Sequence, residues 1–207
     1  NDCVEQGTVP LNKRKFILML TALCNDVRKE DRRFIGEPTE VALAEAYEEC
    51  GEDTPGFKRV GEIPFSSERK LMSTLHSIEG SRYISVTKGA VEFLLPKCTK
   101  YLDSQSPKEM NTNKMNEIIS QNEKMASAGL RVLAVGYKEF SDGNPGVGEI
   151  EKNLTFAGLI GIMDSPRPEV KNAVEMCKTA GIRPVVITGD NSLTAVAIGK
   201  QTGIFKD

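Results

Sequence analysis

The stretch from Val185 to Gly199 joins the pattern of a buried strand to that of a helix, through residues suited to phosphate chemistry. Thr188, Gly189 and Asp190 follow an apolar run, and a helical pattern begins at Asn191 or Ser192. A parallel strand carries such side chains at its carboxyl end, and the helix start behind them offers unpaired N–H groups to an anion. A turn of this kind is also common as a purely structural feature, so its meaning depends on the rest of the chain.

Three upstream segments carry an aromatic ring, cations and small residues at expected strand ends: Phe65 to Lys70, Thr87 to Ala90, and Gly129 to Arg131. An adenine base can stack on an aromatic face, while lysine and arginine pair with phosphates. Each residue also has a plain structural reading, with Phe65 in the core and Lys88 and Arg131 as solvated charges. The residues alone therefore predict a nucleotide site and leave that alternative open.

Composition excludes several other classes of function. The 207 residues carry 27 Lys and Arg against 29 Asp and Glu, so no basic surface for nucleic acid is expected. Five scattered cysteines without a CxxC spacing argue against a disulfide framework or a zinc site. The one histidine, His76, lies in an expected strand and is assigned a structural role. No apolar run approaches the roughly 20 residues of a membrane span, and we expect a soluble intracellular piece.

The first 150 residues alternate helix and strand patterns, and their strands alternate apolar and polar residues. A polar loop is expected over residues 28–33 and another over residues 103–108. Helices are expected over 15–25, 38–50, 91–98 and 111–128, and strands over 60–65, 70–78, 82–87 and 131–140. These elements predict a largely antiparallel sheet flanked by helices.

From Leu154 onward the strands become continuously apolar, which is typical of a parallel sheet covered on both faces. A helix is expected over 168–180, a strand over 183–188, and a last helix from about residue 192. The pattern predicts neighbouring strands at Leu159–Met163 and Val185–Thr188, within an α/β unit that stops early and packs poorly. We therefore expect two domains, residues 1–160 and 161–207.

Six segments, in this order, resemble the cytoplasmic part of P-type cation-transporting ATPases, nearest to the calcium-pump type. They cover nearly the whole chain, and LCND at residues 23–26 is a softer seventh match. The segments are GEPTEVAL (36–43), PFSSERKLMS (64–73), TKGAVE (87–92), GLRVLAV (129–135), MDSPRPEV (163–170) and ITGDNSLTAVAIG (187–199).

The resemblance implies an ATP- or ADP-binding domain followed by part of a Rossmann-like phosphorylation domain of the haloacid-dehalogenase type. In this family the phenylalanine that matches Phe65 stacks on adenine, and the glutamate that matches Glu40 contacts the edge of the base. The lysine that matches Lys88 lines the pocket floor with Gly89 beside it, and Lys70 matches a lysine that lies by the base and the phosphates. Arg131 and Leu133 match residues that reach phosphate and base.

The family's transfer chemistry maps onto the end of the chain. Asp164 to Arg167 correspond to the hinge that returns to the phosphorylation domain, and Thr188, Gly189 and Asp190 correspond to the segment that contacts the transferring phosphate. Ser67 stands where animal calcium pumps carry an arginine. The family's DKTGT and GDGVND segments, which bear the phosphorylated aspartate and the magnesium ligands, do not occur in this sequence. The resemblance thus implies nucleotide binding without hydrolysis by this chain alone.

The implied parent protein is an integral membrane pump, with this chain in its cytoplasmic portion. It would couple ATP hydrolysis, through an aspartyl-phosphate and magnesium, to transport of a cation, with calcium favoured. Its partners would be the actuator and transmembrane domains of the same pump, and we expect a monomeric fragment. Two alternatives remain. One is a soluble phosphatase or phosphotransferase of the haloacid-dehalogenase type, for which this sequence contains no suitable nucleophile motif. The other is a non-catalytic interaction module.

Overall fold

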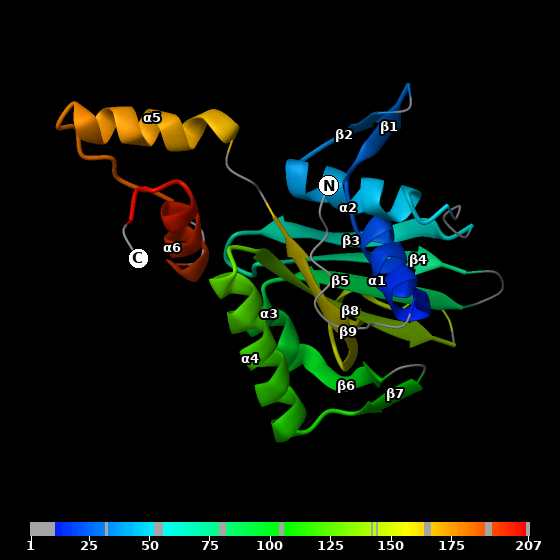
Figure 1. Cartoon of the computed structure of the whole chain (residues 1–207). Coiled ribbons are helices and arrows are strands. Elements are labelled where there is room, and N and C mark those ends of the chain that lie inside the picture. Colours follow the sequence, from blue (N-terminus) through cyan, green and yellow to red (C-terminus); the bar gives the residue numbers. More distant parts are fainter. Residues whose placement is uncertain are drawn as a thin grey trace. The chain divides into compact units, whose positions relative to one another are not determined.

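The computed structural model describes residues 11–31, 33–51, 56–78, 82–103, 106–141, 143, 145–163, 167–188 and 192–205. The chain divides into two compact units (Figure 1). Residues 1–111 with 134–159 form the first unit, and residues 112–133 with 160–207 form the second.

A seven-stranded sheet with the order β3-β4-β5-β8-β9-β6-β7 is the centre of the first unit, although the ends of β8 and β9 extend into the second. Strands β3, β4, β5 and β8 are antiparallel to one another in that order, and β6 is antiparallel to β7, whereas β6 and β9 run parallel. The strands are β3 (Lys58–Ser66), β4 (Leu71–Ser77), β5 (Tyr83–Gly89), β6 (Cys98–Asp103), β7 (Ser106–Glu109), β8 (Arg131–Phe140) and β9 (Leu154–Ile162).

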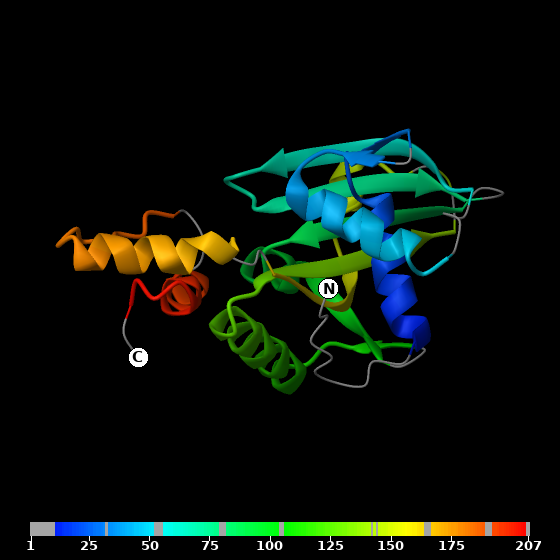
Figure 2. The same cartoon turned by 45° about the horizontal axis from the view of Figure 1, so that its top comes forward.

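Helices α1 (Leu11–Leu23) and α2 (Pro38–Glu48) lie side by side on one face of this sheet (Figures 1 and 2). The Tyr137 ring of β8 meets Phe16 of α1 edge-on, with 5.2 Å between the ring centroids. The neighbouring Gly136 lies against Leu94 of the short helix α3 (Val91–Leu94). Successive residues of a strand point to opposite faces, so α1 and α3 cover opposite faces of the sheet.

Strands β4 and β5 are buried on both faces. Leu71, Val86 and their neighbours pack between the helical layers, and Thr74 and Thr87 bury hydroxyl groups there. A strand that is covered on both sides needs small or apolar side chains at every position. This burial fixes the strand ends, which carry the candidate site, on a rigid support.

Most predicted elements of this unit are confirmed, but the prediction of two polar loops is wrong. Residues 28–35 form a small hairpin, β1 (Arg28–Glu30) with β2 (Arg33–Ile35), and residues 98–109 contribute β6 and β7. Their charged side chains conceal the strand pattern, because both hairpins are largely exposed. Ion pairs that cross the hairpins, such as Lys108 with Asp103, do not produce a periodic pattern in the sequence, so the sequence does not reveal these strands.

The second unit contains three long helices: α4 (Thr112–Ser127), α5 (Pro168–Thr179) and α6 (Ser192–Gln201). Gly129 follows the end of α4 with φ of +84°, which suits glycine, and an added Cβ there would meet Ala197 of α6. Helices α4 and α6 thus pack together. None of the helices described in the structure has the length and apolar character needed to cross a bilayer.

The prediction of a strand at Val185–Thr188 is wrong. These residues are irregular, and the Ile187 side chain is 93% exposed. Leu159 to Ile162 do form the end of β9, but no described strand pairs with the later run. A strand needs a neighbour to bind its N–H and C=O groups, and apolar sequence alone cannot supply one. The described residues of the second unit therefore form no parallel sheet.

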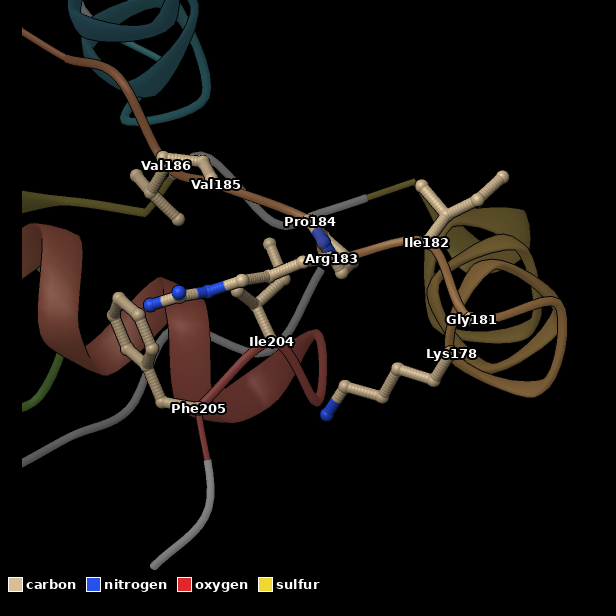
Figure 3. Close-up of a pocket in the computed structure, with 9 residues that line it drawn as sticks. All are labelled: Lys178, Gly181, Ile182, Arg183, Pro184, Val185, Val186, Ile204 and Phe205. Carbon is tan, nitrogen blue, oxygen red and sulfur yellow. The ribbon is translucent and has the colours of Figure 1, made fainter.

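An open hollow lies beside this irregular segment (Figure 3). Lys178 donates a hydrogen bond to the Gly203 carbonyl, so the end of α5 is tied to the turn after α6. Apolar side chains of the segment remain exposed around the hollow, as expected for a region that packs poorly. The lining residues are Lys178, Gly181, Ile182, Arg183, Pro184, Val185, Val186, Ile204 and Phe205.

Candidate functional site

The first feature of the site is a buried ion pair between the start of α2 and the end of β5. Lys88 Nζ lies 2.5 Å from Glu40 Oε1, and the two side chains are 8% and 15% exposed. The second carboxylate oxygen of Glu40 accepts a hydrogen bond from the Asp26 N–H at 3.1 Å. Glu40 sits in the first turn of α2, where the helix dipole favours a negative charge. The sequence-predicted residues Glu40 and Lys88 are therefore brought together.

The second feature is a close backbone approach beside that pair. Gly89 has φ of +154°, and a Cβ built on it would lie 2.1 Å from the Lys70 carbonyl oxygen. The same carbonyl accepts a hydrogen bond from the Ala90 N–H at 3.1 Å. Lys70 itself has φ of +54°, which is uncommon for a residue with a side chain. Glycine is thus required at position 89, where it lets the turn before β4 rest on the end of β5.

The third feature is an exposed aromatic ring on an irregular strand end. The register of β3 against β4 shifts between Ile63 and Ser66, so β3 carries an extra residue there. Bulges re-aim side chains, and a bulge tolerates the missing N–H of Pro64. The Phe65 side chain is 60% exposed. The alternative reading of Phe65 as a core residue is thus wrong, and the ring has a free face for a planar ligand.

An acidic residue absent from the sequence interpretation organises the turn between β3 and β4. Glu151 Oε1 accepts hydrogen bonds from Arg69 Nη1 and Ser73 Oγ, both at 2.7 Å, and its Oε2 lies 3.3 Å from Lys97 Nζ. Burial opposes ionisation of Glu151, but the hydrogen bonds from Ser73 and Arg69 and the nearby cations outweigh it and lower its pKa. Arg69, considered above as a phosphate ligand, is therefore engaged with protein groups.

The thiol of Cys24 and the imidazole of His76 are buried polar groups on the face of β4 that α1 covers. The Cys24 thiol contacts the Met72 carbonyl at 3.6 Å, and burial raises the pKa of this thiol although Lys88 acts in the opposite direction. His76 Nε2 lies 2.9 Å from Thr74 Oγ1. Burial, and to a smaller extent the positive charge of Arg59, lower the pKa of His76 to about 4. His76 is thus a neutral core residue at pH 7, in keeping with a structural role.

This burial predicts an acid-sensitive stability that His76 controls. Between the ordinary pKa of 6.5 and the folded value of about 4, the unfolded chain binds more protons than the folded chain, so stability falls as the pH falls. From pH 7 to pH 4.5 the wild type should lose about 2 kcal/mol more than a His76→Gln variant. Urea unfolding at the two pH values measures the difference, and equal losses would contradict the assignment.

The remaining sequence-predicted residues lie in the second unit. Arg131 is exposed and Leu133 half-buried at the start of β8, and Thr188 is exposed in the irregular segment before α6. Gly189, Asp190 and Asp164 lie outside the described residues. The structure therefore brings together Glu40 with Lys88 and Lys70 with Gly89, and it presents Phe65 on the neighbouring strand end. Arg131, Leu133 and Thr188 belong to the other unit.

A metal site is not formed by the part of the chain that the structure describes. No group of three or more His, Cys, Asp or Glu side chains in this part could hold a metal ion. The acidic residues of the site, Glu40 and Glu151, are each bound to cations of the protein. The donors present suit an aromatic, anionic molecule rather than a bare cation.

Comparison with known proteins identifies relatives over the whole chain. The family described as P-type ATPase, cytoplasmic domain N, matches residues 13–169. Calcium-transporting ATPase 1 of Bacillus cereus is 38% identical over 210 residues, which cover 100% of this chain and 24% of that protein. Calcium-transporting ATPase 1 of Saccharomyces cerevisiae is 40% identical over 199 residues, covering 90% of this chain and 20% of that protein.

A third relative has a broader name. The cation-transporting ATPase pma1 of Synechocystis is 40% identical over 197 residues, covering 90% of this chain and 21% of that protein. The chain therefore spans about a quarter or less of the length of these relatives.

Proposed function

This chain belongs to the P-type ATPases and matches their cytoplasmic domain N. We propose that it binds ATP and ADP where the end of β3, the start of β4 and the end of β5 meet. One observation carries the proposal: the Phe65 ring is 60% exposed on the strand end that adjoins Lys70, Gly89 and the Glu40–Lys88 pair. An exposed phenylalanine beside cations offers adenine a stacking face and offers phosphates a positive charge.

In this proposal Phe65 stacks on the base, and Glu40 accepts a hydrogen bond at the base edge. Lys88 and Gly89 form the pocket floor, and Lys70 meets the phosphates. Arg131 and Leu133 reach phosphate and base in the assembled pump. With one stacked ring and a few screened charges, we expect a dissociation constant from sub-millimolar to millimolar, or roughly 4–5 kcal/mol of binding free energy.

We further propose that the whole protein is a membrane pump that uses ATP hydrolysis, through an aspartyl-phosphate, to move a cation, most reasonably calcium. This chain would lie in its cytoplasmic portion and act with its actuator and transmembrane domains. Residues 1–160 would be the nucleotide-binding domain, and residues 161–207 part of a phosphorylation domain of the haloacid-dehalogenase type. Thr188, Gly189 and Asp190 would contact the transferring phosphate, while magnesium would be held by other residues of the pump.

Replacing Phe65 by alanine tests the binding proposal. The variant should bind ATP and adenosine about 1–3 kcal/mol more weakly, because the stacking face is lost. Its free energy of unfolding should change by only about 0.5 kcal/mol, since the ring is largely exposed. Isothermal calorimetry and NMR titration of the 207-residue chain measure the affinities.

Two variants serve as controls for this titration. Phe93→Ala removes another exposed phenylalanine, on α3, and should leave nucleotide affinity unchanged. Asp190→Asn should also leave it unchanged, because the proposal assigns Asp190 to transfer rather than binding. The proposal is wrong if the wild type binds no nucleotide at several millimolar, or if Asp190→Asn abolishes binding while Phe65→Ala has no effect.

A further inference from the structure

The turn between β3 and β4 has no regular structure of its own, yet it carries Phe65 at one end and Lys70 at the other. Lys70 has φ of +54°, and its N–H donates to the Ser66 carbonyl at 2.7 Å. A residue with a side chain in this conformation costs about 1 kcal/mol or more, so surrounding contacts must hold it. A freely moving turn would also have to lose conformational entropy each time it bound a ligand.

Arg69 supplies the contacts that close this turn. Its Nη2 donates to the Pro64 carbonyl at 3.1 Å and to the Leu71 carbonyl at 2.9 Å, so one guanidinium joins the residues on either side of the turn. The Arg69 N–H also donates to Ser66 Oγ at 3.2 Å. The planar guanidinium has a fixed fork of donors, and its direction therefore sets the shape of the turn.

Glu151 in turn fixes the direction of Arg69 from a distant part of the chain. Its carboxylate is 11% exposed, and Ser73 Oγ and Lys97 Nζ hold it from β4 and from the turn after α3. Ser73 Oγ also lies 2.9 Å from Thr87 Oγ1 on β5. The carboxylate is therefore anchored to the buried centre of the sheet, and it passes that rigidity to the turn through Arg69.

We propose that Glu151 is a positioning residue for nucleotide binding, which acts through Arg69 to hold the Phe65–Lys70 turn in its ligand-ready shape. This inference rests on the proposed function. Glu151 itself touches no nucleotide. It preorganises the ring of Phe65 and the ammonium group of Lys70, so that binding does not have to order them.

Glu151→Gln tests the inference, because glutamine keeps the size of the side chain and removes its charge. At a temperature well below unfolding, the variant should bind both ATP and adenosine about tenfold more weakly, since charge-assisted hydrogen bonds are roughly twice as strong as neutral ones. Amide hydrogen exchange at Lys70 should become about tenfold faster, because the turn opens more often. Exchange at Val86, in the centre of β5, should stay unchanged.

Four comparison variants separate positioning from a general loss of stability. Arg69→Gln should reproduce the loss, and the double variant should be no worse than either single one. Glu149→Gln is the matched control, because Glu149 pairs with Lys152 on the surface and does not reach Arg69. Glu151→Asp, which retains the charge, should recover part of the affinity.

The outcomes are distinguishable. If the wild type binds nucleotide and Glu151→Gln binds it equally well, Glu151 is merely structural and the inference is overturned. This holds whether the melting temperature of the variant is unchanged or lowered. If the wild type binds neither ATP nor adenosine, the proposed function fails and the inference fails with it. Faster exchange at Lys70 together with weaker binding of both ligands supports the inference.

Discussion

Replacing Gly89 by alanine should destabilise the protein by about 2–5 kcal/mol, because two separate costs act at one position. The backbone has φ of +154°, a conformation that L side chains rarely adopt, and the new Cβ would lie 2.1 Å from the Lys70 carbonyl oxygen and 2.9 Å from a Leu71 methyl carbon. That carbonyl belongs to the backbone and also accepts the Ala90 N–H, so it cannot move aside cheaply. Urea unfolding at pH 7 measures the loss.

Gly51→Ala provides a matched control for this effect. Gly51 follows the end of α2 with φ of +69°, but a Cβ on it would meet no described atom within 4 Å. This variant carries the conformational cost alone, which is about 1 kcal/mol. Equal losses at positions 89 and 51 would show that the close approach to Lys70 contributes nothing.

The helix that carries Glu40 and the strand that carries Lys88 and Gly89 could be predicted from the sequence because each sits in a short local pattern. The run that contains Glu40 carries its own helix signals, with Pro38 at the first turn. Lys88 and Gly89 close a strand whose apolar neighbours are adjacent in the chain. Such signals survive without knowledge of the tertiary structure, and the helices and central strands were therefore correctly predicted.

The role of Glu151 could not be predicted in the same way. It is separated from Arg69 by 82 positions, and its own segment is an irregular turn after a short 3-10 helix. Arg69 and Lys70 looked alike as neighbouring cations, and only the folded structure shows that one is engaged with Glu151. The strand expected at Val185–Thr188 failed for a related reason, since strand pairing depends on a distant partner that a local apolar run does not reveal.

The second large effect is expected at the buried pair of Lys88 and Glu40. Lys88→Met keeps the aliphatic stem and removes the cation. The Glu40 carboxylate, which is 15% exposed, then retains its hydrogen bond from the Asp26 N–H but loses its ion pair. The cost should be about 2–4 kcal/mol, since removing one partner strands the other charge in a poorly solvated place. Glu40→Gln should cost less, about 1–2 kcal/mol, because the amide oxygen still accepts a hydrogen bond from Lys88.

The double variant Lys88→Met, Glu40→Gln completes a thermodynamic cycle. It should be more stable than the sum of the single losses predicts, by at least about 1 kcal/mol, because no buried charge is left uncompensated. Urea unfolding of the four proteins gives the coupling energy. Strictly additive losses would mean that the 2.5 Å contact contributes no interaction energy.

The same cycle shows what Lys88 offers to a nucleotide. Because Glu40 already neutralises much of its charge, Lys88 should act on the bound molecule mainly as a wall and hydrogen-bond donor. Lys88→Met should then weaken ATP and adenosine by similar factors, within about threefold of each other, whereas a cation aimed at phosphates would affect ATP far more. Calorimetry with both ligands measures the ratio, and a loss confined to ATP would assign Lys88 to the phosphates instead of the pocket floor.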